Sequence, residues 1–398
     1  MSDSNTTNLR KSLDYYHSAS QLRFDTWHRL EHYTTQLSDR SARKADIARF
    51  KKAAHDAMTI LETIEYYTAF PSRDDFKTLW KFLDREDYST LSRMVVRLVR
   101  AITTHSYQRN TFSSIQRLSV GDESADSEEE IEQDSSQAKP YFEVLFVDDM
   151  SNADETRLRN GLREMRRPDD RFHYEVITVP TFEDALIAVL FNYNIQACVI
   201  RYGFPFRSKN HLDVLQRYLS GLNESDAEEQ PDNDRGPLLG AMISEMRPEL
   251  DLYLVTDVAV EEIAGSIAEK FRRVFYRQED YLELHLAILR GLTSRYETPF
   301  FSALKEYSRK PTGVFHAMPI SRGMSLTKSK WIRDMLDFYG MNVFLAETSA
   351  TSGGLDSLLQ PSGPIKKAQE LAARAFGSSR TYFATNGTST SNKIVVQA

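Results

Sequence analysis

The sequence contains very little cysteine: Cys198 is the single one in 398 residues. A single cysteine excludes an internal disulfide and is typical of proteins from a reducing compartment. The apolar neighbours Ala197, Val199 and Ile200 predict that Cys198 is buried in a strand, which argues against a reactive thiol. Packing must therefore hold the fold together without covalent cross-links.

Long apolar runs and an excess of basic charge are also missing. No apolar stretch approaches the roughly 18 residues that a membrane-spanning helix needs, and the polar start 1–5 has no signal-peptide core. The formal net charge of −7 argues against general nucleic-acid binding. We expect a cytoplasmic protein with neither membrane nor nucleic acid as a partner, and a chain long enough for two or three domains.

Residues 1–116 have the apolar period of helices and are predicted to form a helical N-terminal domain. Pro71-Ser72, followed by Asp74 and Asp75, indicates the end of one helix and the start of the next. The recurring apolar positions are Ile47, Phe50, Ala54, Met58, Leu61 and Ile64, then Leu91, Met94, Val95, Leu98, Val99 and Ile102. Three or more such helices can close a bundle, which we interpret as a packing or assembly module; a regulatory or partner-docking domain is the alternative. The scattered histidines predict no metal site.

Residues 117–139 are predicted to be an acidic, disordered linker. Eight carboxylates occur with no basic residue before Lys139: Asp122, Glu123, Asp126, Glu128, Glu129, Glu130, Glu132 and Asp134. A segment with so much charge of one sign cannot bury enough apolar surface to offset its ordering entropy. A solvated spacer is the first interpretation and a specific docking tail the second.

Residues 140–295 alternate between strand and helix patterns. The predicted strands are 144–147, 174–179, 197–201, 252–256 and 273–276, and the predicted helices are 155–165, 182–191, 212–222, 261–271 and 280–292. Five strands that alternate with helices predict a parallel, doubly wound α/β sheet of flavodoxin type.

The ends of these strands resemble the receiver domain of response regulators. Asp148 and Asp149 follow the first strand, and Thr256 ends the fourth. A phosphoacceptor aspartate should end the third strand, but Arg201 stands there, and the fifth strand ends in Tyr276 rather than lysine. A cation at the metal-ligand position opposes both Mg²⁺ binding and phosphoryl transfer. We expect a receiver-like domain without receiver chemistry, in which Asp148 pairs with Arg201.

The last eighteen residues read TYFATNGTSTSNKIVVQA. The run 381–384 predicts a strand, Asn386-Gly387 a turn, and the residues from Asn392 a helix, with four hydroxyls at 388–391 in between. A strand, a glycine turn and a helix start can form an anion cradle, because free backbone N–H groups and the helix dipole point at one spot. An ordinary Ser/Thr N-cap is the alternative.

A P-loop is excluded, because its motif needs a second glycine directly before the lysine and Lys393 follows an asparagine. Three more motifs precede the cradle, in the order GGLDSLL (353–359), SGPI (362–365) and AARAFG (372–377). With these motifs, the chain from about 298 to its last residue resembles the bacterial ornithine/lysine/arginine decarboxylases, which are fold-type I pyridoxal-phosphate enzymes.

The resemblance implies pyridoxal 5'-phosphate as cofactor, with Gly387, Thr388 and Ser389 at its phosphate. It also implies a basic amino acid as substrate, a diamine or polyamine as product, a homo-oligomer, and a wing domain that corresponds to the receiver-like part. The Schiff-base lysine is expected beyond Ala398, so this chain by itself is expected to be inactive. A non-catalytic receiver-like regulatory or assembly module is the alternative.

The resemblance also divides the end of the chain into a connector (296–330) and the start of the large domain (331–398). In the connector, Phe300, Phe301 and Leu304 are expected to pack a short helix. Many relatives have a His-Thr-Pro-Gly-His-Lys run where this chain has HAMPISRG, which leaves the choice among lysine, arginine and ornithine open. A helix over 331–339 with Gly340 as its C-cap is predicted next.

Overall fold

The structure is a computed structural model whose described residues fall into two compact units, Met1–Leu292 and Thr293–Ala398. Each unit is described by itself. The described residues are 2–39, 43–108, 139–210, 235–257, 270–276, 281–311, 313, 320–347 and 355–397. The predicted linker therefore lies outside them, apart from Lys139.

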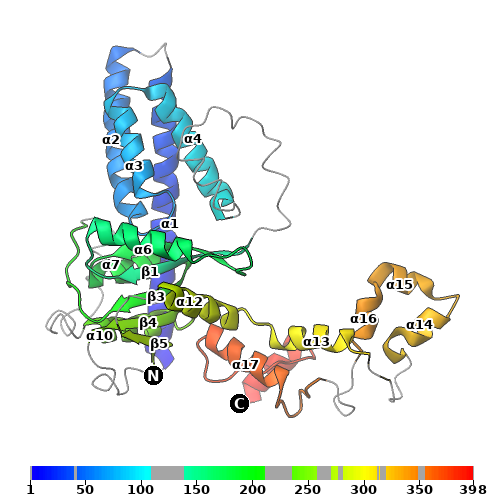
Figure 1. Cartoon of the computed structure of the whole chain (residues 1–398). Helices are drawn as coiled ribbons and strands as arrows, with labels where there is room; N and C mark the ends of the chain where they lie inside the picture. Colours follow the sequence, from blue (N-terminus) through cyan, green and yellow to red (C-terminus); the bar gives the residue numbers. More distant parts are fainter. Residues whose placement is uncertain are drawn as a thin grey trace. The chain divides into compact units, whose positions relative to one another are not determined.

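The first unit begins with four helices that pack side by side (Figure 1). They are α1 (Ser2–Ser38), α2 (Lys44–Glu65), α3 (Arg73–Asp84) and α4 (Tyr88–Thr104). Their apolar stripes meet in one core that includes Trp27, Leu30, Ala54, Met58, Leu61, Leu79, Leu91, Val95, Leu98 and Ile102. The prediction of a helical N-terminal region is confirmed.

Helix α3 begins where the sequence predicted a new start. Ser72 is its N-cap: Ser72 Oγ accepts a hydrogen bond of 3.2 Å from the Asp75 N–H, and Asp75 Oδ2 accepts one of 2.8 Å from the Ser72 N–H. These reciprocal bonds satisfy two backbone donors that the first turn of a helix leaves without a partner.

The sheet of the first unit has five parallel strands in the order β2-β1-β3-β4-β5, which is the flavodoxin-type order. The strands are β1 (Tyr141–Val147), β2 (His173–Val179), β3 (Ile195–Arg201), β4 (Asp251–Thr256) and β5 (Arg273–Tyr276). Each contains a predicted strand, so the doubly wound parallel fold is confirmed.

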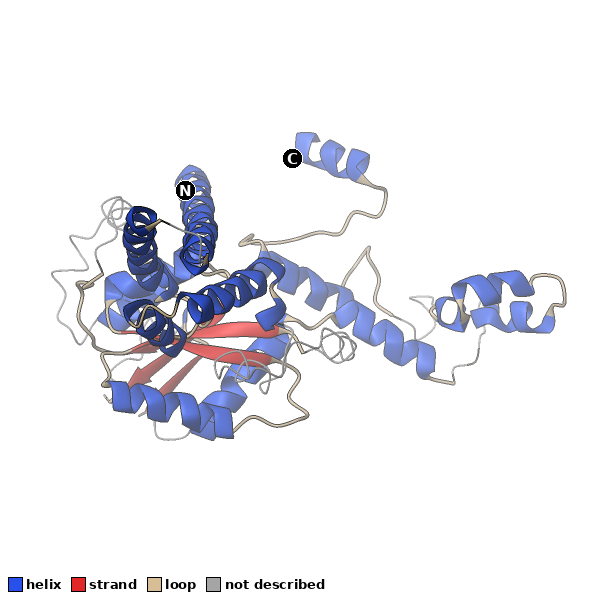
Figure 2. Ribbon diagram, turned by 90° about the horizontal axis from the view of Figure 1, so that it is seen from above, coloured by secondary structure: helices blue, strands red, loops and turns tan. Residues whose placement is uncertain are grey.

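Among the described residues, helices cover both faces of this sheet (Figure 2), α7 and α10 on one and α6 and α12 on the other. Alternate residues of β1 point to opposite faces: Leu145 and Val147 lie in the core under α7 and α10, and Val144 and Phe146 in the core under α6 and α12. The helices are α6 (Asn152–Glu164), α7 (Phe182–Phe191), α10 (Arg235–Met246) and α12 (Tyr281–Arg295). Cys198 is fully buried as predicted.

Helix α10 was not predicted from the sequence. Its first turn contains Gly236 and Pro237, which are typical of loops, yet its packing against the sheet decides the outcome. A side chain at Gly236 would collide with the backbone of Arg201 and Tyr202, so the close approach of the helix requires glycine there. The predicted helix 212–222 lies outside the described residues, as does most of the helix predicted at 261–271.

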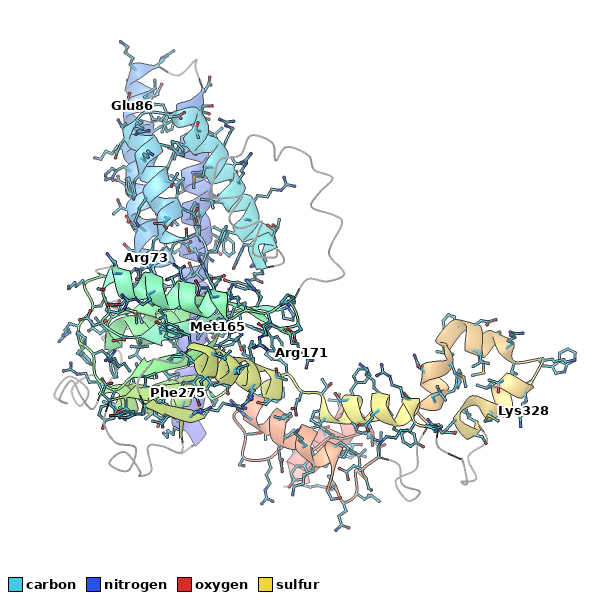
Figure 3. The ribbon with its side chains drawn as sticks, in the orientation of Figure 1. Arg73, Glu86, Met165, Arg171, Phe275 and Lys328 are labelled. Atoms are coloured by element: carbon cyan, nitrogen blue, oxygen red, sulfur yellow. The ribbon has the colours of Figure 1, made fainter. Side chains whose placement is uncertain are left out.

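Arginines cover the outer edge of β2, the first strand of the sheet order. The Arg73 guanidinium donates to the Thr178 carbonyl at 3.3 Å, and that of Arg166 donates to the Tyr174 carbonyl. Figure 3 shows Arg73 at the end of α3 that lies next to α6, where it also pairs with Glu155 at 2.8 Å. Satisfied carbonyls make an edge strand a poor template for pairing with another chain.

The bundle and the α/β part form one compact unit, because α1 also packs against α7 and α10 and Tyr67 enters the core under α7. The domain boundary expected at 116 lies outside the described residues, and the one expected at 140 lies at the start of a described range; both boundaries stay a prediction.

Among the described residues of the second unit, the regular elements are helices joined by loops. The helices are α13 (Pro299–Arg309), α14 (Met324–Lys328), α15 (Arg333–Tyr339), α16 (Met341–Leu345), α17 (Pro364–Ala375) and α18 (Thr388–Gln397), with the 3-10 turn η5 (Ser321–Gly323) before α14. Helix α15 ends at Gly340, whose φ of +73° suits a glycine at the end of a helix, as predicted.

Two local predictions for this unit are wrong. The run 381–384 forms no strand, because a strand needs a neighbour for its backbone groups and the described residues of this unit supply none. Helix α13 exists, but Phe300 and Phe301 are 38% and 58% exposed and Tyr307 is its buried residue. The helix packs against α17 and α16, and of the three residues expected to pack, Leu304 is half-buried.

Candidate functional site

The candidate site lies where α18 begins. Gly387 has a φ of +76°, in the left-handed region that favours glycine, and a Cβ there would meet nothing within 4 Å. The backbone conformation, rather than lack of space, therefore requires glycine at this turn. Helix α18 starts directly afterwards at Thr388, four residues earlier than the sequence suggested, so the hydroxyl run is part of its first turn.

The first turn of α18 leaves donors free of helical partners. The carbonyl of Gly387 accepts from the N–H groups of Thr390 (3.1 Å) and Ser391 (3.4 Å), which defines the helix start. The N–H groups of Thr388 and Ser389 precede these bonds and point out of the helix end. Because Gly387 occupies the N-cap position, no side chain can cap this helix as a serine or threonine would.

The donor set at this turn fits a phosphate group. The backbone N–H groups of Gly387, Thr388 and Ser389 lie at the positive end of a helix, and two hydroxyls add further donors. All three residues are exposed. The Thr390 hydroxyl donates to the Asn386 carbonyl at 3.4 Å, so its proton already has an acceptor within the turn. The structure brings the three predicted residues together at one helix end; their role as a cofactor site stays a prediction.

The start of α17 shows the same kind of helix end with an anion already in place. The Asp356 carboxylate accepts five backbone hydrogen bonds, and sequence reasoning did not predict this role. The donors are the N–H groups of Ser357 (2.9 Å), Ser362 (2.9 Å), Gly363 (2.7 Å), Ile365 (3.0 Å) and Lys366 (3.3 Å). Asp356 therefore joins the LDSLL and SGPI motifs into one loop around the helix start.

The Asp356 carboxyl titrates well below its usual range. Desolvation would raise its pKa, but the backbone hydrogen bonds from Ser362 and Gly363, together with that from Ser357, lower the pKa to about 2. Hydrogen bonds to the charged form favour ionisation. The loop at 356–366 is thus organised by a carboxylate that stays charged into acid.

Replacing Asp356 with alanine should loosen this loop. The loss of a helix cap costs about 0.5–2 kcal/mol, so amide hydrogen exchange at 357–366 should accelerate. Asp337, exposed on α15, provides the matched control, because Asp337→Ala removes a carboxylate with no such bonds. Equal exchange in the two variants would contradict the role given to Asp356.

The same bonds predict how acid acts on the loop. The folded-state pKa of Asp356 is below the ordinary aspartate value of about 3.9, so its stabilising contribution is present above that value. It should be lost as the pH falls through about 2. Amide exchange at 357–366 in the unaltered protein, corrected for intrinsic pH effects, measures this loss.

One open cavity of about 340 Å³ lies between α13 and the start of α17. Its lining residues are Glu297, Pro299, Ser302, Ala303, Glu306, Gly363, Pro364 and Lys367. The Lys367 ammonium pairs with Glu297 across it at 2.5 Å. Each charge here has a partner of opposite sign close by, which suits a bridge between two helices.

The carboxyl ends of β1, β3 and β4 bring the receiver-like residues together. The Arg201 guanidinium donates to Asp148 Oδ2 at 3.0 Å and to Asp257 Oδ2 at 3.1 Å. The expected Asp148–Arg201 pair is thus present. Burial raises the pKa of the Asp148 carboxyl, and Arg201 opposes this rise. A fixed guanidinium here binds the carboxylate that would hold Mg²⁺ in a receiver.

We therefore expect that the receiver-like part does not accept phosphate. Incubation with acetyl phosphate and Mg²⁺ should leave the intact mass of the protein unchanged. Arg201 stands at the position of the phosphoacceptor aspartate, and its guanidinium pairs with the Asp148 carboxylate that would otherwise bind Mg²⁺. A response-regulator receiver treated in parallel is the positive control. A stable adduct on Asp148 or Asp149 would overturn this expectation.

Two kinds of feature are absent from the described residues. Among them, no group of three or more His, Cys, Asp or Glu side chains could hold a metal ion. Across the same part of the chain, every helix is too short or too polar to cross a bilayer.

Comparison with known proteins bears on the second unit above all. Residues 298–398 match the family described as "Orn/Lys/Arg decarboxylase, major domain". The inducible lysine decarboxylase of Escherichia coli (strain K12) is 27% identical over 59% of this chain and 29% of its own length. The arginine decarboxylase of Bacillus anthracis is 40% identical over 24% of this chain and 18% of its own length.

The chain spans less than a third of the length of these curated relatives. A solved lysine decarboxylase of Francisella novicida shares 19% identity and a TM-score of 0.29 over 64% of this chain and 32% of its own, a likeness too low to support an argument. The family match confirms the resemblance to the Orn/Lys/Arg decarboxylases over the part of the chain that carries the motifs.

Proposed function

We propose that this chain supplies the phosphate-binding corner of a pyridoxal-phosphate-dependent decarboxylase of basic amino acids. The substrate class is ornithine, lysine or arginine, and the product a diamine or polyamine. The observation that supports this proposal most directly is the positive-φ Gly387 followed by the helix start at Thr388 and Ser389, within residues that match the decarboxylase family.

Each residue of the corner has a definite task in this proposal. Gly387 turns the backbone so that successive N–H groups converge on one point, and the Thr388 and Ser389 hydroxyls add donors from the side. The helix dipole of α18 favours the negative charge of the phosphate. The bound cofactor would supply an electron sink for the carbanion that remains after CO₂ leaves. The phosphate-binding corner itself binds and orients the cofactor through its phosphate, and it transfers no proton.

The loop around Asp356 supports the corner in a different way. Its carboxylate already fills the helix start of α17, so this second helix end is closed to an external anion. Of the two helix starts, the one at Gly387 is the one that can receive the cofactor phosphate. Homo-oligomer formation, a basic amino acid as partner and a cytoplasmic location are part of the same proposal.

The proposal is tested by comparing two ligands that differ in the phosphate alone. Pyridoxal phosphate should bind the protein more tightly than pyridoxal in equilibrium dialysis, and inorganic phosphate should compete with it. Equal binding of both ligands, without competition by inorganic phosphate, would reject the corner as the cofactor site.

A further inference from the structure

Helix α4 carries a stripe of arginines. Arg93, Arg97 and Arg100 are spaced by four and three residues, which places them on one side of the helix. Between Tyr88 and Gln108 the sequence has no aspartate or glutamate. The stripe is about 10 Å long, from the helical rise of roughly 1.5 Å per residue. It forms a compact positive surface on a protein whose net charge is −7.

The two ends of the stripe face solvent and lack acidic partners. Arg93 and Arg100 are exposed, and neither forms an ion pair with a carboxylate of the described residues. Arg93 makes one long contact of 3.5 Å with the Thr90 hydroxyl. Elsewhere in this unit, Arg73 and Arg159 both pair with Glu155.

The opposite side of α4 belongs to the core of the bundle. Leu91, Val95, Leu98 and Ile102 are buried against neighbouring helices, and Val96, beside the stripe, is 41% exposed. Helix α4 packs against α1 and α3, so the stripe is on the side that the bundle leaves uncovered. A partner for this side must therefore come from outside the four helices.

The chain's own acidic residues are attached beside this stripe. Residues 109–138, which contain them, leave the described structure after the 3-10 turn η1 (Ser106–Gln108) and return at Lys139. The rings of Tyr107 and Tyr141 meet edge to face with centroids 5.8 Å apart. Both attachment points therefore lie together at the carboxyl end of α4.

The chain between Lys139 and the acidic residues is long enough for them to reach the arginines of α4. Asp134 is five residues before Lys139, a span of up to about 17 Å when extended. Arg100 lies about one helical turn from the end of α4, roughly 6 Å along the axis. A tether of this kind raises the effective concentration of the acidic residues near the helix into the millimolar range.

We propose that the acidic residues 122–134 bind in the same chain to the Arg93–Arg97–Arg100 stripe of α4. The occupant is chosen by charge, because residues 122–134 contain eight carboxylates and no base while residues 88–108 contain no acid, and by its attachment at the end of the same helix. The contacts are exposed ion pairs and are therefore weakened by salt. Such binding occupies the stripe and excludes other polyanions from α4.

The first test uses zero-length carbodiimide cross-linking, which joins an amine to a carboxylate in contact with it. Arg93→Lys with Arg100→Lys keeps the charge and introduces amines at these positions. Peptide mapping should find cross-links from positions 93 and 100 to 122–134, lost at about 1 M salt, where the Debye length is near 3 Å. Lys44 and Lys52, exposed on α2, are internal controls and should give none.

The cross-links also show whether residues 122–134 bind to α4 of their own chain or to α4 of a second copy. In a mixture of ¹⁴N- and ¹⁵N-labelled protein, intrachain binding gives cross-linked peptides of a single label. Mixed labels would assign the segment to a second copy and overturn the proposal. Equal yields at positions 93 and 100 and at the control lysines would overturn it too.

The second test leaves the segment unaltered. Arg93→Gln with Arg100→Gln should speed cleavage by a glutamate-specific protease within 128–132 by roughly three- to tenfold at low salt, because cleavage follows the unbound population. Lys44→Gln with Lys52→Gln removes the same charge from α2 and should leave the rate unchanged. An unchanged rate in the arginine variant would reject the proposal.

Discussion

Replacing Thr388 and Ser389 together with alanine is expected to weaken pyridoxal phosphate binding by roughly one to four orders of magnitude. Each hydroxyl would donate a charge-assisted hydrogen bond to the phosphate, worth about 1.5–3 kcal/mol. The loss of binding free energy stays below the sum of the two hydrogen-bond energies, because the backbone N–H groups at the start of α18 still bind the phosphate. Equilibrium dialysis with pyridoxal phosphate measures the change.

A matched control removes the same atoms a few residues away. The Ser378 and Thr381 hydroxyls contact each other at 3.1 Å before the turn, so Ser378→Ala with Thr381→Ala should leave the affinity unchanged. Pyridoxal, which has no phosphate, should bind the Thr388/Ser389 variant as it binds the unaltered protein. If the double variant kept its affinity for pyridoxal phosphate, the phosphate contact would have to lie elsewhere.

The sheet could be predicted because its signal is local. Buried parallel strands contain continuous apolar runs, as at residues 197–200 of β3, and the helices between them begin after residues such as Thr181 that cap the first turn. The Arg201–Asp148 pair followed from the same reasoning, because the carboxyl ends of neighbouring parallel strands meet at one edge. Order and pairing of the strands then follow from the rules for doubly wound sheets.

Contacts between distant segments gave no such signal. Tyr174 was predicted in a strand and His285 in a helix, but nothing in the pattern predicted that they meet. The Tyr174 hydroxyl lies 2.9 Å from His285 Nδ1 in a buried contact, and Asp170 Oδ2 lies 3.2 Å from His285 Nε2. The glycine turn of the candidate site was predictable from Asn386-Gly387. The backbone cage around Asp356 was not, since its donors come from up to ten residues further along the chain.

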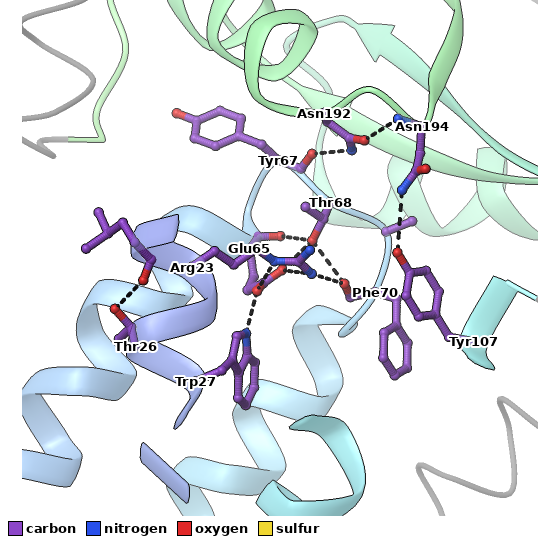
Figure 4. Close-up of polar contacts among 12 residues, drawn as sticks. Arg23, Thr26, Trp27, Glu65, Tyr67, Thr68, Phe70, Tyr107, Asn192 and Asn194 are labelled. Carbon is purple, nitrogen blue, oxygen red and sulfur yellow. Dashed lines mark hydrogen bonds and ion pairs between the residues drawn. The ribbon is translucent and has the colours of Figure 1, made fainter. Parts of the chain in front are cut away.

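The largest stability loss is expected for Glu65→Ala, at about 3–5 kcal/mol from the free energy of unfolding of the first unit. The Glu65 side chain is 1% exposed. It accepts hydrogen bonds from Arg23 Nε (2.6 Å) and Nη2 (2.8 Å), Trp27 Nε1 (2.6 Å) and the Thr68 hydroxyl (2.6 Å) (Figure 4). Its removal leaves the Arg23 charge without its counter-ion and Trp27 Nε1 without its acceptor, while the Thr68 hydroxyl keeps the Phe70 carbonyl at 3.2 Å.

The position of Glu65 widens the effect beyond α2. It is the last residue of that helix, and the segment that follows holds the bundle to the α/β part: the Tyr67 carbonyl accepts from Asn192 at 2.8 Å, and the Tyr67 hydroxyl donates to Asp184 at 2.8 Å. Losing the anchor at Glu65 should loosen this junction. Amide exchange should therefore accelerate in 66–70 as well as in α2.

Glu62→Ala is the matched control for this prediction. Glu62 lies one turn earlier on α2 and also accepts from a tryptophan Nε1, that of Trp80 at 3.0 Å, but it is exposed. Its loss should cost about 1 kcal/mol or less. Urea unfolding followed by tryptophan fluorescence compares the two variants. If Glu65→Ala cost no more than Glu62→Ala, burial would not set the strength of this network, and the Arg23–Glu65 pair would count as a surface pair.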